Sequence, residues 1–256
     1  MGPPLSTGQE PAGTISRVDS ARHIVKITYG EFELTANLYA LRAVSARLRA
    51  LVDASEAELP PAASRLGVQV LLNWLSSGNI EVYDPDDDDE DENDGGIVNN
   101  PEQDDDDDWW TVTVLCEAYK TGEALDVSAD FLDAVMDQIV DTVVKPNDRS
   151  GERIIDLARV LSKTWESGSP GRLFVVEWLF HDKFESAEGT FGFQVAEFIE
   201  ECDAHCFRNE FLLAVFNGWE AGDLLPWEED GKHRYHVRRD GALRYMFIRQ
   251  RPAVRF

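Results

Sequence analysis

Three side chains able to bind a metal lie close together near the carboxyl-terminal end of the chain: Cys202, His205 and Cys206. Thiolates and imidazoles are zinc ligands, and these positions would share one face of a helix. The sequence offers no second Cys/His pair to complete a site, and the nearest other candidates are His181 and Cys116. Small buried cysteines between aromatic neighbours are the commoner explanation. We therefore expect no metal and no cofactor.

Within the acidic segment 84–108, Glu90-x-Glu92-x-Asp94-Gly95 is similar to the start of a calcium-binding loop. Pro101 occupies the twelfth position, where such a loop needs a glutamate. Between positions 84 and 108 there are fifteen Asp or Glu residues and no Lys or Arg. Like charges at this density repel one another and cannot form a core. We therefore expect a disordered acidic loop over 84–108.

Motifs typical of enzymes are missing from the sequence. It contains no G-x-S-x-G, G-x-G-x-x-G, G-x-x-x-x-G-K or H-E-x-x-H pattern. Its many carboxylates occur in runs of one sign, which are typical of solvated surface rather than of acid–base pairs. We expect a protein that is not an enzyme, with no catalytic and no cofactor-binding residue.

A basic tail, 231–256, follows the acidic remainder of the chain. From Lys232 to Phe256 there are eight Lys or Arg residues against Asp240 alone, interleaved with Tyr235 and Tyr245. This mixture suits single-stranded nucleic acid, but it also suits a short edge hairpin or attraction to the acidic loop. The net charge of −25 disfavours general binding to nucleic acid. We favour the structural or intramolecular role.

The cysteine content and hydropathy place limits on the compartment. Three cysteines are too few and too scattered for a disulfide framework. The first 21 residues have neither an apolar run nor a basic start, and no apolar stretch approaches the ~20 residues that span a bilayer. We expect a cytoplasmic or nuclear protein without a membrane partner.

The pattern of apolar residues predicts an α+β amino-terminal domain over 22–145. A flexible leader, 1–21, precedes strands at 23–29 and 32–34, which are joined by a turn at Gly30-Glu31. One helix with a buried stripe follows from Leu38 to Val52. The next helix begins after Ser64 as its N-cap and ends at Gly78 as its C-cap.

Helices dominate the rest of the chain. Beyond the acidic loop we expect a helix over 109–120 and another that begins after Ser128. Lys145-Pro146-Asn147-Asp148 breaks the pattern and marks the expected domain boundary. A mainly α-helical carboxyl-terminal region, 150–230, then includes a stripe from Ile154 to Trp165 and an aromatic series over 191–219. The tail 231–256 contains a turn at Asp240-Gly241 that would allow a short hairpin.

The order of these elements over 22–144 resembles the BTB/POZ domain, especially its divergent forms in filamentous fungi. Ser45-Ala46-Arg47-Leu48-Arg49-Ala50-Leu51 resembles the family's Ser-Pro-x-Phe-Arg-x-Leu segment. Trp74-Leu75-Ser76-Ser77-Gly78-Asn79-Ile80 resembles Trp-Leu-Tyr-Thr-Gly-x-Ile, and 115–125 resembles Leu-x-x-Ala-Tyr-x-Leu-Ala. The residues that carry the resemblance are Phe32, Leu34, Leu41, Ser45, Leu48, Trp74, Leu75, Gly78 and Ile80.

The resemblance implies a domain for self-association and protein binding, with a homodimer as the expected state. Several relatives connect substrates to cullin-type ubiquitin ligases, so a cullin scaffold is an implied partner. Thr35-Ala36 stands where the family usually has a His-Lys pair, and Leu48 replaces its aromatic residue. The alternative is a nuclear factor that binds basic partners such as histones through the acidic loop, or nucleic acid through the tail.

Overall fold

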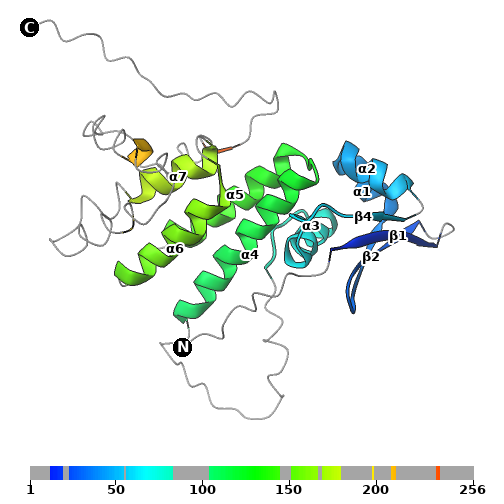
Figure 1. Ribbon diagram of the computed structural model, residues 1–256, viewed down its shortest axis with the longest axis horizontal. Coiled ribbons are helices and arrows are strands. Elements are labelled where there is room, and N and C mark those ends of the chain that lie inside the picture. Colours follow the sequence, from blue (N-terminus) through cyan, green and yellow to red (C-terminus); the bar gives the residue numbers. More distant parts are fainter. Residues whose placement is uncertain are drawn as a thin grey trace, which may run out of the picture. The chain divides into compact units, whose positions relative to one another are not determined.

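The computed structural model describes residues 12–19, 23–54, 56–82, 104–144, 151–166 and 169–179, together with 198, 209–211 and 235–236. The chain divides into two compact units, Met1–Val160 and Leu161–Phe256. The first contains a small antiparallel sheet and several helices, and is thus α+β (Figure 1).

Four strands form the sheet of the first unit: β1 (Thr14–Asp19), β2 (Ile24–Tyr29), β3 (Phe32–Asn37) and β4 (Glu56–Glu58). All neighbours are antiparallel, in the order β3-β2-β1-β4. Gly30 has a φ of +58° at the first position of the two-residue turn between β2 and β3, where glycine is favoured. The predicted strand at 23–29 is confirmed as β2, along which Val25, Ile27 and Tyr29 are buried and alternate with half-buried residues.

The prediction of a flexible leader over 1–21 was wrong for residues 14–19. These residues form β1, which lies between β2 and β4 inside the sheet. Ile15 pairs with Ile27 on one side and with Ala57 on the other, and it is only 1% exposed. The side chain of this one isoleucine is buried in the sheet, whereas its neighbours include small polar residues, so composition alone predicts a flexible leader here.

The predicted single helix over 38–52 is two helices, α1 (Leu38–Val44) and α2 (Ala46–Asp53). Ser45 separates them, because its backbone is extended, with φ −154° and ψ 138°, and its side chain accepts a hydrogen bond from the Leu48 N–H. The buried stripe continues across this break. Its members are Leu38 and Leu41 in α1, and Leu48 and Val52 in α2.

The predicted caps of α3 (Arg65–Ser77) are confirmed. The Ser64 hydroxyl accepts a hydrogen bond from the Gly67 N–H at 3.1 Å, which satisfies one of the free donors of the first turn. Gly78 has a left-handed φ of +78°, and its N–H donates to the Trp74 carbonyl at 2.8 Å. This is the conformation that ends many helices at glycine.

Helices α4 (Asp104–Ala124) and α5 (Ala129–Val144) follow in the first unit, which also includes residues 151–160 of α6 (Gly151–Thr164). α4 packs against both α3 and α5. A Cβ added to Gly67 of α3 would lie 2.2 Å from the Thr121 Oγ1 of α4, so the two helices meet closely. Figure 1 shows α3 beside α4, although the segment between them in the sequence includes residues 83–103.

The predicted disordered loop over 84–108 extends too far. Its last five residues, all aspartates, belong to α4, which begins at Asp104. Acidic residues are favoured near a helix amino terminus because they interact with the positive end of the helix dipole. The remainder of the predicted loop, 84–103, lies outside the described residues.

The second unit contains the end of α6 (Gly151–Thr164) and α7 (Pro170–Trp178). The division between the units thus falls inside α6, beyond the boundary expected at 145–148. Ser169 caps α7 by accepting from the Arg172 N–H at 3.3 Å, and Pro170 takes the first helical position, where proline is favoured.

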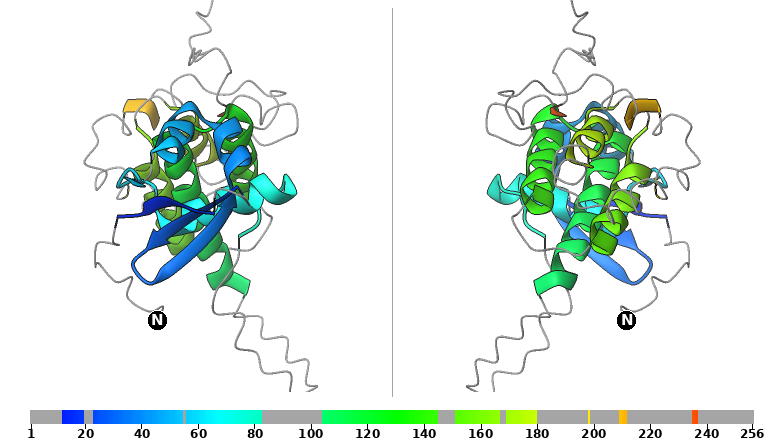
Figure 2. Two further views of the ribbon diagram at one scale, coloured as in Figure 1. Left: turned by 90° about the vertical axis from the view of Figure 1, so that its right-hand side faces the viewer. Right: turned by 90° about the vertical axis from the view of Figure 1, so that its left-hand side faces the viewer.

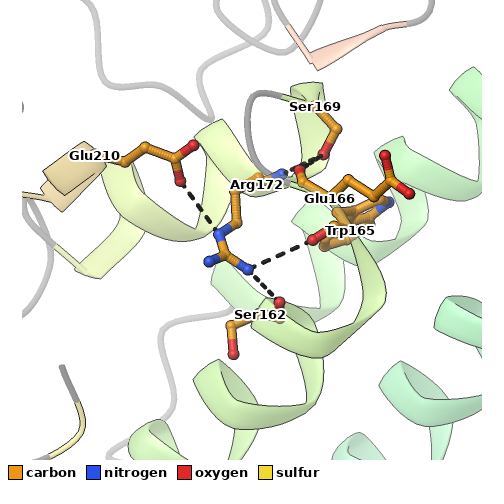
Figure 3. Close-up of polar contacts among 6 residues, drawn as sticks. All are labelled: Ser162, Trp165, Glu166, Ser169, Arg172 and Glu210. Carbon is orange, nitrogen blue, oxygen red and sulfur yellow. Dashed lines mark hydrogen bonds and ion pairs between the residues drawn. The ribbon is translucent and has the colours of Figure 1, made fainter. Parts of the chain in front are cut away.

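A buried arginine joins three segments of the second unit (Figure 3). The Arg172 side chain donates from Nε to Glu210 Oε2 at 3.2 Å and from Nη1 to the carbonyls of Ser162 and Trp165. Arg172 is 5% exposed, so its charge needs these partners. One guanidinium therefore satisfies carbonyls at the end of α6 and pairs with a carboxylate further along the chain.

A second buried contact also starts from α7. The Tyr235 hydroxyl donates to Glu177 Oε2 at 2.6 Å, and the Tyr235 ring meets Phe174 edge-on at 5.3 Å. Both buried charged residues of α7 are thus satisfied by residues far along the chain. Apart from residues 198, 209–211 and 235–236, the predicted aromatic series and the basic tail lie outside the described residues.

Candidate interaction surface

Strand β3 forms one edge of the sheet and leaves apolar side chains incompletely covered. Register pairs Phe32 with Tyr29 and Leu34 with Ile27, so these side chains point to the same face as the core residues of β2. Tyr29 and Ile27 are 3% and 1% exposed, whereas Phe32 is 57% exposed and Leu34 is half-buried. At this edge the core face of the sheet is therefore only partly covered by the rest of the unit. We call the surface formed by Phe32–Asn37 the β3 edge.

Phe32 is held in position by a cation. The guanidinium carbon of Arg65 lies 4.0 Å from the centroid of the Phe32 ring. Such a contact stabilises an exposed pair by about 0.5–1 kcal/mol. Arg65 is the first residue of α3, whose start is anchored because the Ser64 N–H donates to Thr121 Oγ1 at 3.2 Å. The exposed ring thus has a defined position next to a rigid helix.

The hairpin that carries the β3 edge projects from the first unit. In Figures 1 and 2 the tip of the β2–β3 hairpin points away from α1 and α2. An ion pair between Lys26 of β2 and Glu33 of β3 joins the two strands on the polar face of the sheet. Both side chains are partly exposed, so this pair contributes little to stability, about 0–1 kcal/mol. Its effect here is to balance the charge of Glu33.

A second exposed aromatic residue follows β3 in the chain. Tyr39 in α1 is 57% exposed, the same fraction as Phe32. Its hydroxyl lies 3.3 Å from Nε2 of His23, and the two rings are 4.7 Å apart. The Leu38 N–H donates to the His23 carbonyl at 2.8 Å, which fixes the start of α1 beside the start of β2.

The residues singled out from the sequence occupy three separate places. Phe32 and Leu34 lie on the β3 edge. Around the junction of α1 and α2, the three residues Leu41, Ser45 and Leu48 are buried at 1%, 5% and 1% exposure. The third group lies at the end of α3, where Trp74, Leu75 and Ile80 are half-buried and Gly78 is exposed.

Among these residues, Phe32 of the first group is the large apolar side chain that is mostly exposed. In the third group, Trp74 contacts the ring of Phe131 in α5 edge-on, with centroids 5.3 Å apart, so it is part of the packing between helices. The groups at the α1–α2 junction and at the end of α3 are thus chiefly structural.

Ser45 links distant parts of the first unit. Its hydroxyl accepts from the Leu48 N–H at 3.1 Å and donates to the carbonyl of Leu125, 80 residues away in the sequence. One hydroxyl can do both, because it carries one proton and two lone pairs. The serine of the family-like segment therefore connects the start of α2 to the end of α4.

A buried tyrosine lies in α4 near two carboxylates. Tyr119 is 1% exposed. Burial raises the pKa of its phenol well above the ordinary value of 10.0, and the negative charges of Glu123 and Asp133 raise the pKa further. The group is therefore uncharged at neutral pH and is part of the core.

Three exposed or edge-contacting residues were not identified from the sequence: Arg65 and Thr35 at the β3 edge, and Tyr39 of α1, which lies outside that edge. Arg65 follows a recognisable N-cap, but nothing in the sequence places it over Phe32, 33 positions away. Tyr39 lies outside the apolar stripe of its helix, which is a usable signal for exposure. Thr35 was noted only as a departure from the family pattern, and it is exposed in the middle of the β3 edge.

Several expected or rejected sites fall elsewhere. Cys202, His205 and Cys206 lie outside the described residues, as does the calcium-like segment 90–101. Among the side chains that the structure describes, no three metal-binding residues are grouped as they would be around an ion. No helix within the described ranges is both long and apolar enough to cross a membrane.

Comparison with known proteins gives no match of any kind: no family model, no curated protein and no solved structure resembles the chain at a significant level.

Proposed function

We propose that the first unit is a BTB-type protein-interaction domain without enzymatic activity, and that it acts as an adaptor in the cytoplasm or nucleus. The observation that carries this proposal is the β3 edge, where the 57% exposed ring of Phe32 is held against Arg65 beside Leu34. A fixed aromatic residue on an exposed sheet edge is a typical anchor for another polypeptide.

The order of elements supports the family assignment. A β2–β3 hairpin is followed by α1 and α2, a short strand β4, and then α3, α4 and α5. The sequence resemblance described above predicts the hairpin, α3, α4 and α5 in that order. Self-association as a homodimer and recruitment of a cullin scaffold follow from the resemblance, and the fold alone does not imply either.

The test compares two exposed aromatic residues. Affinity capture with the full chain, after crosslinking and with a cullin included in the readout, should yield specific protein partners. Phe32→Ser should abolish or strongly reduce capture, because it removes the anchor of the β3 edge. Tyr39→Ser is the matched control, since Tyr39 is equally exposed.

The expected result is loss of partners in the first variant and their retention in the second. If both variants capture the same partners as the unchanged chain, the β3 edge does not carry the function. If an enzyme assay of the purified chain revealed turnover of a substrate class, the non-enzymatic part of the proposal would fail.

A second candidate is a nuclear factor that binds histones or other basic proteins through acidic residues. It is favoured by one observation: five consecutive aspartates form the beginning of α4, directly after the acidic segment 84–103. Deletion of 84–103 combined with replacement of the aspartates at 104–108 by asparagine removes the whole acidic run and leaves the β3 edge unchanged in sequence. Loss of histone binding on deletion would support this candidate, whereas unchanged partners would support the adaptor.

A further inference from the structure

The outer side of β3 carries backbone groups available for pairing. β3 is the end strand in the order β3-β2-β1-β4, so only β2 pairs with it among the described strands. The two-residue turn at Gly30-Glu31 makes Tyr29 and Phe32 the closing pair, and antiparallel pairing alternates from there. Even-numbered residues of β3 therefore direct their backbone groups to β2. Those of Glu33 and Thr35 face outward.

The side chains on this edge continue the pattern of the sheet. Phe32, Leu34 and Ala36 point to the core face, and the exposed side chains of Glu33 and Thr35 point to the polar face. The side chains of Phe32, Leu34 and Ala36 have a neighbouring strand, β2, on one side only. Another strand added at this edge would cover the part of them that is exposed. The strand contains no proline that would prevent pairing.

A second copy of the chain fits this edge in one register. If the β3 strands of two copies pair antiparallel about Leu34, the core faces of the two sheets lie on the same side. Glu33 of each copy, whose backbone groups face outward, then lies opposite Thr35 of the other copy. On the core face, the large Phe32 then lies opposite the small Ala36, and Leu34 lies opposite Leu34. No like charges face each other. The edge is therefore complementary to itself in size and free of like-charge repulsion in this register.

The opposite edge of the sheet lacks this property. β4 consists of Glu56, Ala57 and Glu58. Pairing of two β4 strands about Ala57 would place Glu56 of one copy opposite Glu58 of the other, twice. Like charges directly opposite one another destabilise a strand pair. Charged edges of this kind are a common defence against association, and β3 does not have it in the Leu34 register.

We propose that β3 pairs with β3 of a second copy, antiparallel about Leu34, so that two four-stranded sheets form one continuous sheet across a twofold axis. The inference rests on the self-association included in the proposed function and names the surface that carries it. A twofold contact of this type closes on itself and yields a dimer rather than a fibre.

The test uses substitutions at Thr35 in the full chain, with sedimentation velocity over about 1–100 µM. Thr35→Glu places like charges opposite Glu33 of the partner at two symmetric positions, and we expect dimerisation to weaken by roughly five- to thirtyfold. Thr35→Lys creates two opposite-charge pairs and should strengthen the dimer. Thr35→Pro removes an outward N–H without removing a donor to β2, and should weaken the dimer by at least about tenfold.

Two controls separate association from folding. Thr35→Val keeps the backbone N–H and adds no charge, so its dimer should match that of the unchanged chain. Within one chain Thr35 pairs with Lys26, so Thr35→Glu creates a favourable pair and should leave the melting temperature intact. Circular dichroism of each variant confirms the fold.

The outcomes distinguish the two levels of the proposal. A strictly monomeric chain up to about 100 µM overturns both the β3 pairing and the self-association in the proposed function. A dimer that none of the Thr35 variants affects overturns the β3 pairing alone. If Thr35→Lys weakens the dimer as much as Thr35→Glu does, Thr35 faces its own copy, and the Leu34 register is refuted.

Discussion

Replacing Ser45 by alanine removes two hydrogen bonds with one atom. The hydroxyl caps α2 through the Leu48 N–H and donates to the buried carbonyl of Leu125. Loss of an N-cap costs about 1 kcal/mol of stability. A buried carbonyl without its donor costs a further 1–3 kcal/mol or so. The expected loss in the free energy of unfolding of the first unit is therefore about 2–4 kcal/mol.

Ser64→Ala is the matched control for this prediction. Ser64 also caps a helix, accepting from the Gly67 N–H at the same distance of 3.1 Å as Ser45 accepts from Leu48. Its side chain makes no long-range bond that the structure records, so only the capping part, about 1 kcal/mol, should be lost. The difference between the two variants isolates the bond to Leu125.

Urea unfolding followed by hydrogen exchange and mass spectrometry measures this difference in the first unit, because peptides from α2 and from residues 121–127 report it separately from the second unit. The midpoint should fall more in Ser45→Ala, with an unchanged slope. If both variants lose the same free energy, the bond between Ser45 and Leu125 does not stabilise the native protein. The start of α2 and the end of α4 would then not be linked energetically through this serine.

Two further predictions concern the core of the first unit. Gly67→Ala should destabilise it by roughly 1–3 kcal/mol or more, because the new methyl would lie 2.2 Å from Thr121 Oγ1 and 2.7 Å from the Glu117 carbonyl oxygen. Gly78→Ala is the control, because a Cβ there meets open space and the variant should lose only the roughly 1–2 kcal/mol of stability that a left-handed alanine costs. If Gly67→Ala and Gly78→Ala have equal melting temperatures, the close contact of α3 and α4 is contradicted. The raised pKa of Tyr119 means that its protonated phenol stabilises the fold below pH ~10 and that this stability is lost as pH rises further. The free energy of unfolding should therefore fall less steeply above pH 10 in Tyr119→Phe than in the unchanged chain, by about 1.4 kcal/mol per pH unit. If the two stability profiles against pH are parallel, the phenol ionises freely in the native state.

Local signals in the sequence predicted much of the first unit. Ser64 and Gly78 carry strong capping preferences, and both ends of α3 were confirmed. The β-branched residues of β2 and the glycine turn before β3 are similarly local signals, as are the apolar spacing in α4 and the start of α5 after Ser128. Such features depend on the nearest few residues and so can be recognised without tertiary information.

The missed features depend on residues far apart in the sequence. β1 is held by pairing of Ile15 with Ile27 and Ala57, which no local pattern reveals. The break at Ser45 is stabilised by a carbonyl at position 125. The exposed edge at Phe32 was recognised only as a family-like apolar residue, because exposure depends on which helices cover the sheet. Tertiary context thus decided each of these cases.

The partners of α7 limit where the chain can be cut. Arg172 and Glu177 are both about 5% exposed, and each is satisfied by a residue well downstream, Glu210 and Tyr235 respectively. A protein that ends before residue 209 would retain α7 but lose the Glu210 carboxylate beside Arg172. A protein that ends before residue 235 would also lose the Tyr235 hydroxyl, from which Glu177 accepts a hydrogen bond. Breaking a buried ion pair such as Arg172–Glu210 costs about 3–5 kcal/mol, and removing the Tyr235 hydroxyl takes away a hydrogen bond to the Glu177 carboxylate, about 1.5–3 kcal/mol. Soluble expression of the second unit should therefore require the chain through Tyr235, even though the last long helix described ends at Trp178.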